Sequence, residues 1–340
     1  MRIRLIALAL VGAVSAVTQA AAQENATDPR IVIRDTVRRM VSVYQGRNRG
    51  PEQTEAFSRK VKAGRDGRIT ISNIAGDIVV TGGSRDEVAI EAVKRTRGDR
   101  SELAMVHITV DERGGRVDVR TDHTGRNDHV SVDYTITVPE SAAVELHSIS
   151  GSLKVANVQG AVRMETISGN VTTSAAPHVE VAKSVSGDVD LTATSIDGDL
   201  TASSLSGHVR ARGVKARVLQ LGSVSGDVSV SDVSCDRVDV KSVSGSVEFS
   251  GTLLRSGRYD LHSHSGTVRL ILSGNTGFEL HAGSFSGQIR SELPMMVGGT
   301  DANGRRRVMT NRSMNATFGD GSAVITVRTF SGDVVISKGR

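Results

Sequence analysis

A four-residue phrase recurs along most of this chain: a hydroxyl residue, an apolar residue, serine and then glycine, as in Ser223-Val-Ser-Gly226. Successive phrases lie 18 to 21 residues apart, and only the last follows a longer gap, of 45 residues. Self-similarity at such a period is the signature of a solenoid, in which each repeat forms one turn and contacts only its neighbours. The glycines of the phrase are Gly151, Gly169, Gly187, Gly207, Gly226, Gly245, Gly266, Gly287 and Gly332.

The apolar positions within each repeat indicate where its backbone bends. Side chains alternate between two faces along a strand, and the repeat around Gly245 has apolar residues at even positions before Lys241 and at odd positions after Ser242. This change of phase predicts two short strands joined by a tight corner, with the apolar residue of the phrase, here Val243, facing the core. The glycine either avoids crowding at the corner or supplies a positive φ, and the sequence leaves both reasons open.

These repeats predict an all-β fold, a parallel β-solenoid (β-helix) of about nine to ten short turns over residues 141–337. One turn buries too few apolar side chains to offset the entropy of ordering it, so the turns are stable only as a stack. We expect a right-handed coil, from the general handedness of parallel crossovers. Residues 293–318 break the pattern and are expected to form a projecting loop. The last turn ends at Ile336, which leaves its edge open to pairing with another chain.

The sequence before the repeats has a different organisation. Residues 57–140 begin with one degenerate turn at Gly76 and continue with alternating strands and a hairpin-like turn at Glu112–Gly115, which predicts a small antiparallel β cap on the N-terminal end. Residues 23–56 place apolar side chains at helical spacing among arginines. We expect a linker or a short amphipathic helix laid on the protein, and a helix at a membrane surface is the alternative.

Residues 1–22 have the pattern of a cleavable secretory signal peptide. Arg2 and Arg4 precede an apolar run from Leu5 to Val17, and small residues end at Ala22. The run is too short to span a bilayer, and no run of spanning length follows it. We therefore expect an exported protein, periplasmic or at the cell surface or secreted, with no transmembrane segment after signal cleavage.

The composition excludes several classes of protein. Cys235 is the only cysteine, so no internal disulfide forms even in an oxidising compartment. The net charge is +5 before the signal removes two arginines, which gives no general case for binding nucleic acid. The chain has no Trp, six Phe and three Tyr, so it lacks the stacking platforms of single-strand binders.

Several longer phrases resemble those of a known bacterial family. The matching segments are Ser184-Val-Ser-Gly-Asp-Val189, Ser223-Val-Ser-Gly-Asp-Val228, Gly76-Asp-Ile-Val-Val80 and Asp133-Tyr-Thr-Ile-Thr-Val-Pro139. Over residues 57–337 the chain is similar to an exported β-strand-repeat family of unknown function labelled "putative adhesin". The resemblance implies an exported parallel β-solenoid. It brings no ligand and no catalytic residues to transfer, because a fold does not determine a function.

The hydroxyl residues of the phrase form two columns once the turns are stacked. Serine at a corner is small and bonds readily to the backbone, which is one explanation of both columns. An exposed array that binds a glycan, or faces ice, is the other explanation. The candidate binding surface consists of the second column and of the basic loop: Ser150, Ser168, Ser186, Ser206, Ser225, Ser244, Arg305, Arg306 and Arg307.

No catalytic residue, cofactor or metal is predicted. A hydrolase elbow would need serine where Gly222-Ser-Val-Ser-Gly226 has Val224. Cys235 has no histidine beside it, and His262 with His264 makes only a His-x-His pair, where tolerated histidines near the corner are expected rather than a metal site.

The remaining chemical candidate is a group of four aspartates on adjacent turns. They suit either solubilising edge charges or a β-helix enzyme that cleaves acidic polysaccharide. These residues are Asp188, Asp190, Asp197 and Asp199.

The sequence favours an exported, non-enzymatic, adhesin-like binding or scaffold protein of the bacterial envelope, whose partner is an unknown envelope glycan or protein. One alternative is a regulatory protein of envelope stress that contacts a membrane or a protein partner through its basic segments. The other alternative is a β-helix polysaccharide-degrading enzyme.

Overall fold

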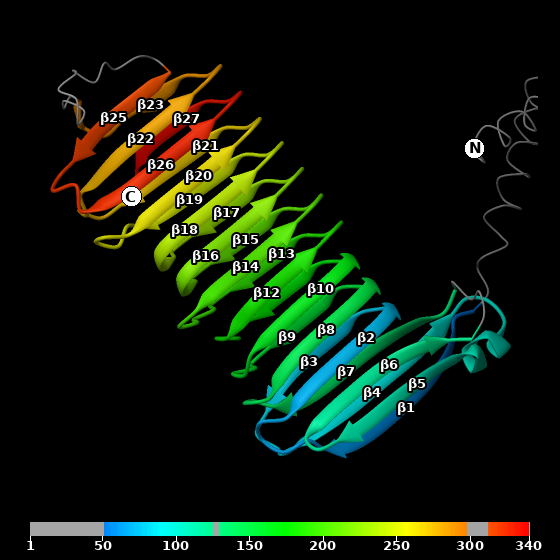
Figure 1. Ribbon diagram of the computed structural model, residues 1–340. Coiled ribbons are helices and arrows are strands. Elements are labelled where there is room, and N and C mark those ends of the chain that lie inside the picture. The colour runs from blue at the N-terminus through cyan, green and yellow to red at the C-terminus, as the bar shows by residue number, and fades with distance from the viewer. Residues whose placement is uncertain (1–50, 125–128, 298–311, 340) are drawn as a thin grey trace, which may run out of the picture. The chain divides into compact units, whose positions relative to one another are not determined.

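The computed structural model describes residues 51–124, 129–297 and 312–339. The predicted signal, most of the predicted amphipathic segment and the arginines Arg305 to Arg307 lie outside these residues. Residues from Gln53 onward form one compact unit of two long sheets (Figure 1). The all-β parallel solenoid is confirmed, and its handedness stays a prediction.

Each sheet is named here by its number of strands. The 14-stranded sheet has the spatial order β24 (Met296–Val297), β25 (Ser313–Phe318), β22 (Phe278–Ser284), β26 (Ala323–Thr329), β20 (Arg258–Ser263), β18 (Ser234–Ser242), β16 (Lys215–Ser223), β14 (Asp199–Ser204), β12 (Val179–Ser184), β10 (Val162–Ser168), β8 (Ala143–Ser150), β2 (Arg68–Ala75), β6 (Arg116–His123) and β5 (Val106–Arg113). The 13-stranded sheet has the order β1 (Gln53–Lys62), β4 (Glu87–Thr96), β7 (Ser131–Pro139), β3 (Ile78–Gly83), β9 (Leu153–Ala156), β11 (Val171–Ser174), β13 (Val189–Thr192), β15 (Val209–Arg212), β17 (Val228–Ser231), β19 (Val247–Thr252), β21 (Val268–Ser273), β27 (Val334–Lys338) and β23 (Ile289–Ser291). A short 3₁₀ helix, η1 (Arg100–Met105), follows β4.

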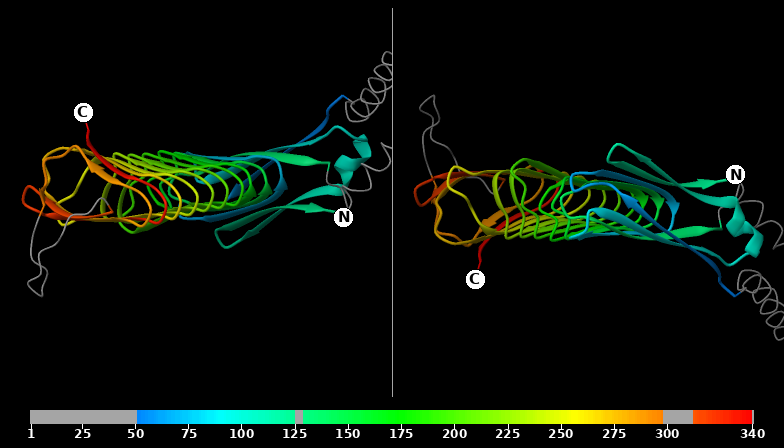
Figure 2. Two further views of the ribbon diagram at one scale, coloured as in Figure 1. Left: turned by 90° about the horizontal axis from the view of Figure 1, so that it is seen from above. Right: turned by 90° about the horizontal axis from the view of Figure 1, so that it is seen from below.

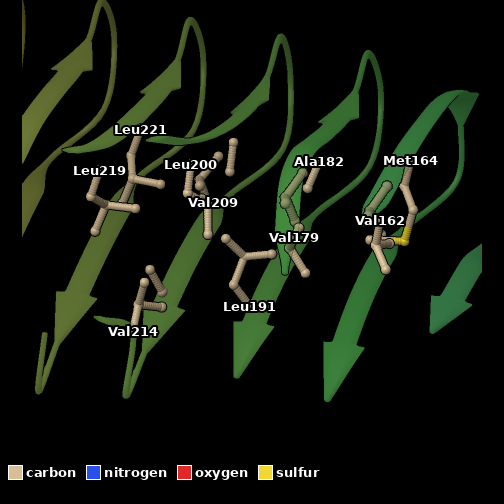
Figure 3. Close-up of a cluster of buried hydrophobic side chains, with 14 of the residues drawn as sticks. Val162, Met164, Val179, Ala182, Leu191, Leu200, Val209, Val214, Leu219 and Leu221 are labelled. Atoms are coloured by element: carbon tan, nitrogen blue, oxygen red, sulfur yellow. The ribbon is translucent and has the colours of Figure 1, made fainter. Parts of the chain in front are cut away.

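Each turn contributes one strand to each sheet. In one turn, β10 lies in the 14-stranded sheet and β11 in the other, and both pair in parallel with the strands of the next turn, β12 and β13. Successive turns lie one behind another in both views of Figure 2. The apolar side chains of each turn point between the two sheets, where Met164, Leu191 and Leu200 from three turns are buried together (Figure 3).

The corner of each turn lies two residues later than the sequence pattern predicts, at Val243 and Ser244 rather than at Lys241 and Ser242. Val240 and Ser242 are both buried at the end of β18, Val243 and Ser244 are exposed, and burial resumes at Gly245. The prediction that the apolar residue of the phrase faces the core is therefore wrong. The first hydroxyl residue takes the inward position instead, because its polar group finds a backbone partner inside the corner.

The phrase glycines are required by close approach of successive corners. A Cβ on Gly226 would overlap the carbonyl oxygen of Gly207, and a Cβ on Gly207 would overlap that of Gly187. None of the nine phrase glycines has a positive φ. Crowding therefore explains the glycine, and the crowding partner is the glycine of the neighbouring turn.

The spatial order of the turns departs from the chain order at both ends. The turn of β2 and β3 lies between those of β6–β7 and β8–β9, so β6 and β7 form a further turn that the sequence pattern does not reveal. The turn of β26 and β27 likewise lies between those of β20–β21 and β22–β23. The predicted open edge at Ile336 is therefore wrong, since β27 pairs with β21 and with β23.

Antiparallel strands follow the outermost parallel turns. At the N-terminal end β5 pairs with β6, β4 with β7, and β1 with β4. At the other end β25 pairs with β22 and β24 with β25. Residues 293–318, expected to be a projecting loop, thus contain two strands that extend the 14-stranded sheet.

A buried polar network joins the outer turn of β6 and β7 to that of β2 and β3. The hydroxyls of Thr121 and Tyr134 lie 2.7 Å apart, and Thr121 donates to Asn73 Oδ1 at 2.9 Å. The Asn73 amide donates to the carbonyl oxygen of Val132 at 2.8 Å and to that of Gly76 at 3.0 Å. Burial raises the pKa of Tyr134 to about 12, so its hydroxyl stays protonated.

Replacing Gly226 by alanine is expected to destabilise the protein by about 1–3 kcal/mol, because the added Cβ must displace the carbonyl of Gly207. Gly222→Ala is the matched control, since a Cβ there meets only the Lys241 carbonyl oxygen at 3.8 Å. We expect a shift within about 0.5 kcal/mol for the control. Urea unfolding followed by circular dichroism measures both, and equal losses would contradict the crowding argument.

Candidate functional site

The apolar residues of the phrase form one exposed line along the corners of the stack, which we call the ridge. Ile149 is 51% exposed, Leu205 49% and Phe285 67%. Backbone hydrogen bonds hold successive corners together, as from Ser206 N–H to the Val185 carbonyl oxygen at 2.9 Å. In spatial order the ridge consists of Ile149, Ile167, Val185, Leu205, Val224, Val243, His264, Phe330 and Phe285.

The ridge is aromatic near its C-terminal end. The His264 ring stacks on Phe330 with centroids 4.9 Å apart, and Phe330 stacks on Phe285 at 4.7 Å. His264 occupies the corner position that Val243 has in the preceding turn, and like Val243 it is exposed rather than directed to the core. Within the described residues no group of three or more His, Cys, Asp or Glu side chains could hold a metal ion.

The first hydroxyl column is buried and bonded to the backbone. Ser223 donates to the carbonyl oxygen of Gly207 at 2.9 Å and accepts from the N–H of Gly226 at 2.9 Å. The same donor bond, to the glycine of the adjacent turn, recurs from Thr166 to Thr329. This column serves the fold, because these hydroxyls donate to backbone carbonyls of the adjacent turns.

The second hydroxyl column lies beside the ridge and faces outward. Each of its predicted binding residues is exposed, and they follow the ridge residues directly in the chain: Ser150, Ser168, Ser186, Ser206, Ser225 and Ser244. The other predicted residues, Arg305, Arg306 and Arg307, lie outside the described residues. The structure thus places the six serines along one edge.

A shallow groove of about 820 Å³ runs along the other side of the ridge. Ridge residues from Ile167 to Val243 form one wall, and the outward residues that precede the buried hydroxyls form the other. That second wall is low where Ser203 and Gly222 stand, and it carries charge where Lys183 Nζ lies 3.9 Å from Glu165. The sequence pattern missed this groove because it placed the ridge residues in the core.

Where an aspartate or asparagine follows a corner glycine, its side chain caps the neighbouring turn. Asp188 Oδ1 accepts from the backbone N–H of His208 at 2.9 Å, and Asp227 Oδ1 accepts from that of Ser246 at 2.8 Å. Asp77, Asn170 and Asp333 make the same bond. Aspartate in the phrase is thus explained by backbone satisfaction.

Three of the four aspartates considered for polysaccharide cleavage form ion pairs with arginines. Arg210 Nη1 lies 3.1 Å from Asp188 and 3.2 Å from Asp190, and Arg217 pairs with Asp199 at 2.8 Å. Burial acts to raise the pKa of Asp188, but the hydrogen bond from His208 and the Arg210 guanidinium hold this pKa below its usual value. A carboxyl of lowered pKa is a poor general acid at neutral pH.

Cys235 is a core residue. Its side chain is fully buried, and burial raises the pKa of its thiol to about 11. The thiolate is the reactive form of cysteine, so a thiol of this kind is inert at neutral pH.

The chain matches one family model and is similar to several solved structures. A family model described as Toastrack DUF4097 matches residues 66–337. A "putative adhesin" from Bacteroides fragilis NCTC 9343 is similar in structure, with 14% identity and a TM-score of 0.42, and the match covers 84% of this chain and 97% of that chain. A "putative lipid binding protein" from Parabacteroides distasonis ATCC 8503 shows 10% identity, a TM-score of 0.40 and the same coverage of both chains. No curated protein matches the chain.

Substitution by alanine should lower stability in the first hydroxyl column and leave it almost unchanged in the second. Ser223→Ala leaves the Gly207 carbonyl and the Gly226 N–H without their partner, so we expect a loss of about 1–3 kcal/mol. Ser225→Ala, on the exposed column, should change stability by less than about 0.5 kcal/mol. Urea denaturation of the two variants provides the comparison, and a destabilised Ser225→Ala would refute the distinction.

Cys235 should resist thiol reagents in the folded protein. Because its raised pKa leaves it protonated and its side chain is buried, we expect almost no reaction with Ellman's reagent at pH 8 within an hour. The same protein in 8 M urea should release one equivalent of chromophore. Rapid labelling of the native protein would show that this part of the core opens readily.

Proposed function

Because the chain belongs to the Toastrack DUF4097 family, we propose that it is an exported, non-enzymatic binding or scaffold module of the bacterial envelope, and that its ligand lies along the ridge and groove. Adhesin-like binding is the coarse function that the family and its structural neighbours suggest. The envelope location rests on the signal-like residues 1–22. Among the described residues no helix is long and apolar enough to cross a membrane.

The unbroken line of exposed apolar side chains carries this proposal. Soluble monomers rarely expose a large contiguous apolar patch, and such a patch rimmed by polar groups marks an interaction site. Here the exposed serines rim one side, and charged residues such as Lys183 and Lys241 rim the other. The ridge residues contribute little to the core, so packing does not explain why they are apolar.

The shape of the groove favours a long ligand. It passes the corners of all the strands from β8 to β18, one strand per turn. At about 4.8 Å per turn these corners extend over roughly 25 Å. An extended chain that repeats contacts along its length, such as a glycan or peptide strand, suits a surface of this length better than a compact metabolite does.

The chemistry of the candidate residues supports a role other than catalysis. The buried hydroxyls are bonded to glycine carbonyls, Asp188 and Asp190 are held by Arg210, and the Cys235 thiol is protonated and buried. None of these groups is placed as an activated nucleophile beside a base.

The test is binding of the mature protein to a panel of envelope glycans, peptidoglycan and anionic lipid vesicles, with two variants alongside. Gly222→Leu fills the groove at its low wall, where an added Cβ meets only the Lys241 carbonyl oxygen at 3.8 Å. Ser229→Leu places the same side chain on β17, on the other sheet. We expect saturable binding to one component of the panel, weakened at least tenfold by Gly222→Leu and unchanged by Ser229→Leu.

Thermal unfolding should show that both variants stay folded. A blank panel, or a panel in which Gly222→Leu weakens binding to no component, would refute the ridge and groove as the binding surface. Release of reducing sugar ends from a bound polysaccharide, lost on replacing Asp188 and Asp190, would instead establish the enzyme alternative.

A further inference from the structure

A second, separate hollow lies at the C-terminal end of the 14-stranded sheet. Gly283 on β22 stands opposite Arg328 on β26 and opposite Ser313 on β25. The equivalent outward positions on β18 and β20 carry Lys241 and His262. The missing side chain at Gly283 leaves a hollow of about 370 Å³, and a Cβ built there meets nothing within 4 Å.

The walls of this hollow are rich in cationic and donor groups. Arg312 and Arg328 line it together with His281, Asn315 and Thr326, and no carboxylate is among its described lining residues. His281 Nδ1 lies 2.9 Å from Asn315 Oδ1, so the two side chains hold one another in place.

Two carboxylates lie near the hollow. Glu279 Oε2 is 4.0 Å from His281 Nε2. Asp260, the strand neighbour of Thr326, lies 3.5 Å from Arg237. Both carboxylates therefore already face a cationic or potentially cationic group, and the Arg328 guanidinium gives the hollow a positive charge.

The aromatic end of the ridge directly follows, in the chain, two residues that line the hollow. Ser284 and Thr329 line its floor, and their hydroxyls donate to the carbonyl oxygens of Gly332 at 2.9 Å and Gly266 at 3.3 Å. Phe285 and Phe330 follow these residues directly in the chain and stack on one another. An anionic ligand in the hollow would thus have an exposed apolar ring beside it.

We propose that this hollow binds an acidic sugar unit of an envelope polysaccharide, a uronic acid or another carboxylate-bearing sugar. The planar guanidinium group of Arg328 matches the geometry of a carboxylate, and Asn315 and Thr326 supply hydrogen bonds for hydroxyls. The apolar face of the sugar ring would lie against Phe285. This inference rests on the proposed binding function and adds to it a second site, separate from the groove, with its own ligand class.

The form of the site favours a sugar over a lipid surface. A membrane meets protruding side chains, whereas here the cationic and hydrogen-bonding groups line a hollow between three strands. The volume lies within the range of small-ligand sites. A sugar unit fills such a space and uses its polar walls, while a planar headgroup layer contacts only its rim.

Isothermal titration of the full mature chain with oligogalacturonate, at low and at physiological salt, tests the proposal. A neutral oligoglucoside of equal length, inorganic phosphate and phosphatidylglycerol vesicles are the comparison ligands. We expect saturable binding of oligogalacturonate alone, weakened by salt because the contact is ionic. Arg328→Gln should weaken it at least fivefold and Gly283→Leu should abolish it.

Matched variants separate the hollow from general charge and from the groove. Arg290→Gln removes an exposed arginine on β23, in the other sheet, and should leave the affinity unchanged. Gly222→Leu blocks the groove and should also leave oligogalacturonate binding intact. Because Gly283 faces open space, Gly283→Leu should keep its unfolding temperature, which excludes misfolding as the cause of any loss.

Several results would overturn the inference. Equal binding of the neutral oligosaccharide, or oligogalacturonate binding that survives in Arg328→Gln and Gly283→Leu, would exclude a carboxylate site in the hollow. Binding of phosphate or vesicles alone, lost in Gly283→Leu, would replace the sugar by an anionic headgroup. Envelope binding that Gly222→Leu abolishes and Gly283→Leu spares would leave the proposed function standing and refute this inference alone.

Discussion

The contact between the corner glycines of adjacent turns determines most of this structure. Each phrase glycine lies so close to the carbonyl of the neighbouring glycine that no side chain fits between them, and from Thr166 onward the buried hydroxyl of the phrase donates to that same carbonyl. This pair of constraints fixes the stacking register at one edge of every turn. A parallel sheet then continues on both sides of the corner, and the core follows from the alternation of side chains along the two strands.

The corner also separates the structural residues of the phrase from those that are free. In Ser223-Val-Ser-Gly-Asp227 the first serine, the glycine and the aspartate each satisfy or avoid a backbone group of an adjacent turn. The side chains of Val224 and Ser225 do neither and face outward. Their repetition on turn after turn yields an apolar ridge beside a row of hydroxyls, and selection for binding is a simpler explanation of that ridge than stability.

The two ends of the stack solve the same problem in the same way. A parallel stack presents unpaired backbone at its last turn, which is a template for aggregation. At each end two turns that are consecutive along the chain lie in reversed spatial order, and antiparallel strands extend the outer turn. The edge strand β1 carries Glu55, Arg59, Lys60 and Lys62, and such charges discourage further pairing. At the C-terminal end the same arrangement brings β25 and β26 to either side of Gly283 and so creates the hollow.

The sequence by itself determined the period and the parallel β-solenoid, because these depend on local spacing that every turn repeats. It misplaced Val243, since alternation reveals that a corner exists but not which pair of successive outward residues forms it. It also misjudged the end at Ile336, because turns with the same apolar pattern stack equally well beside one another and only the complete stack fixes their order. The groove beside Gly222 and the hollow at Gly283 were decided by the tertiary structure alone, because each is a missing side chain framed by residues that lie far apart in the chain.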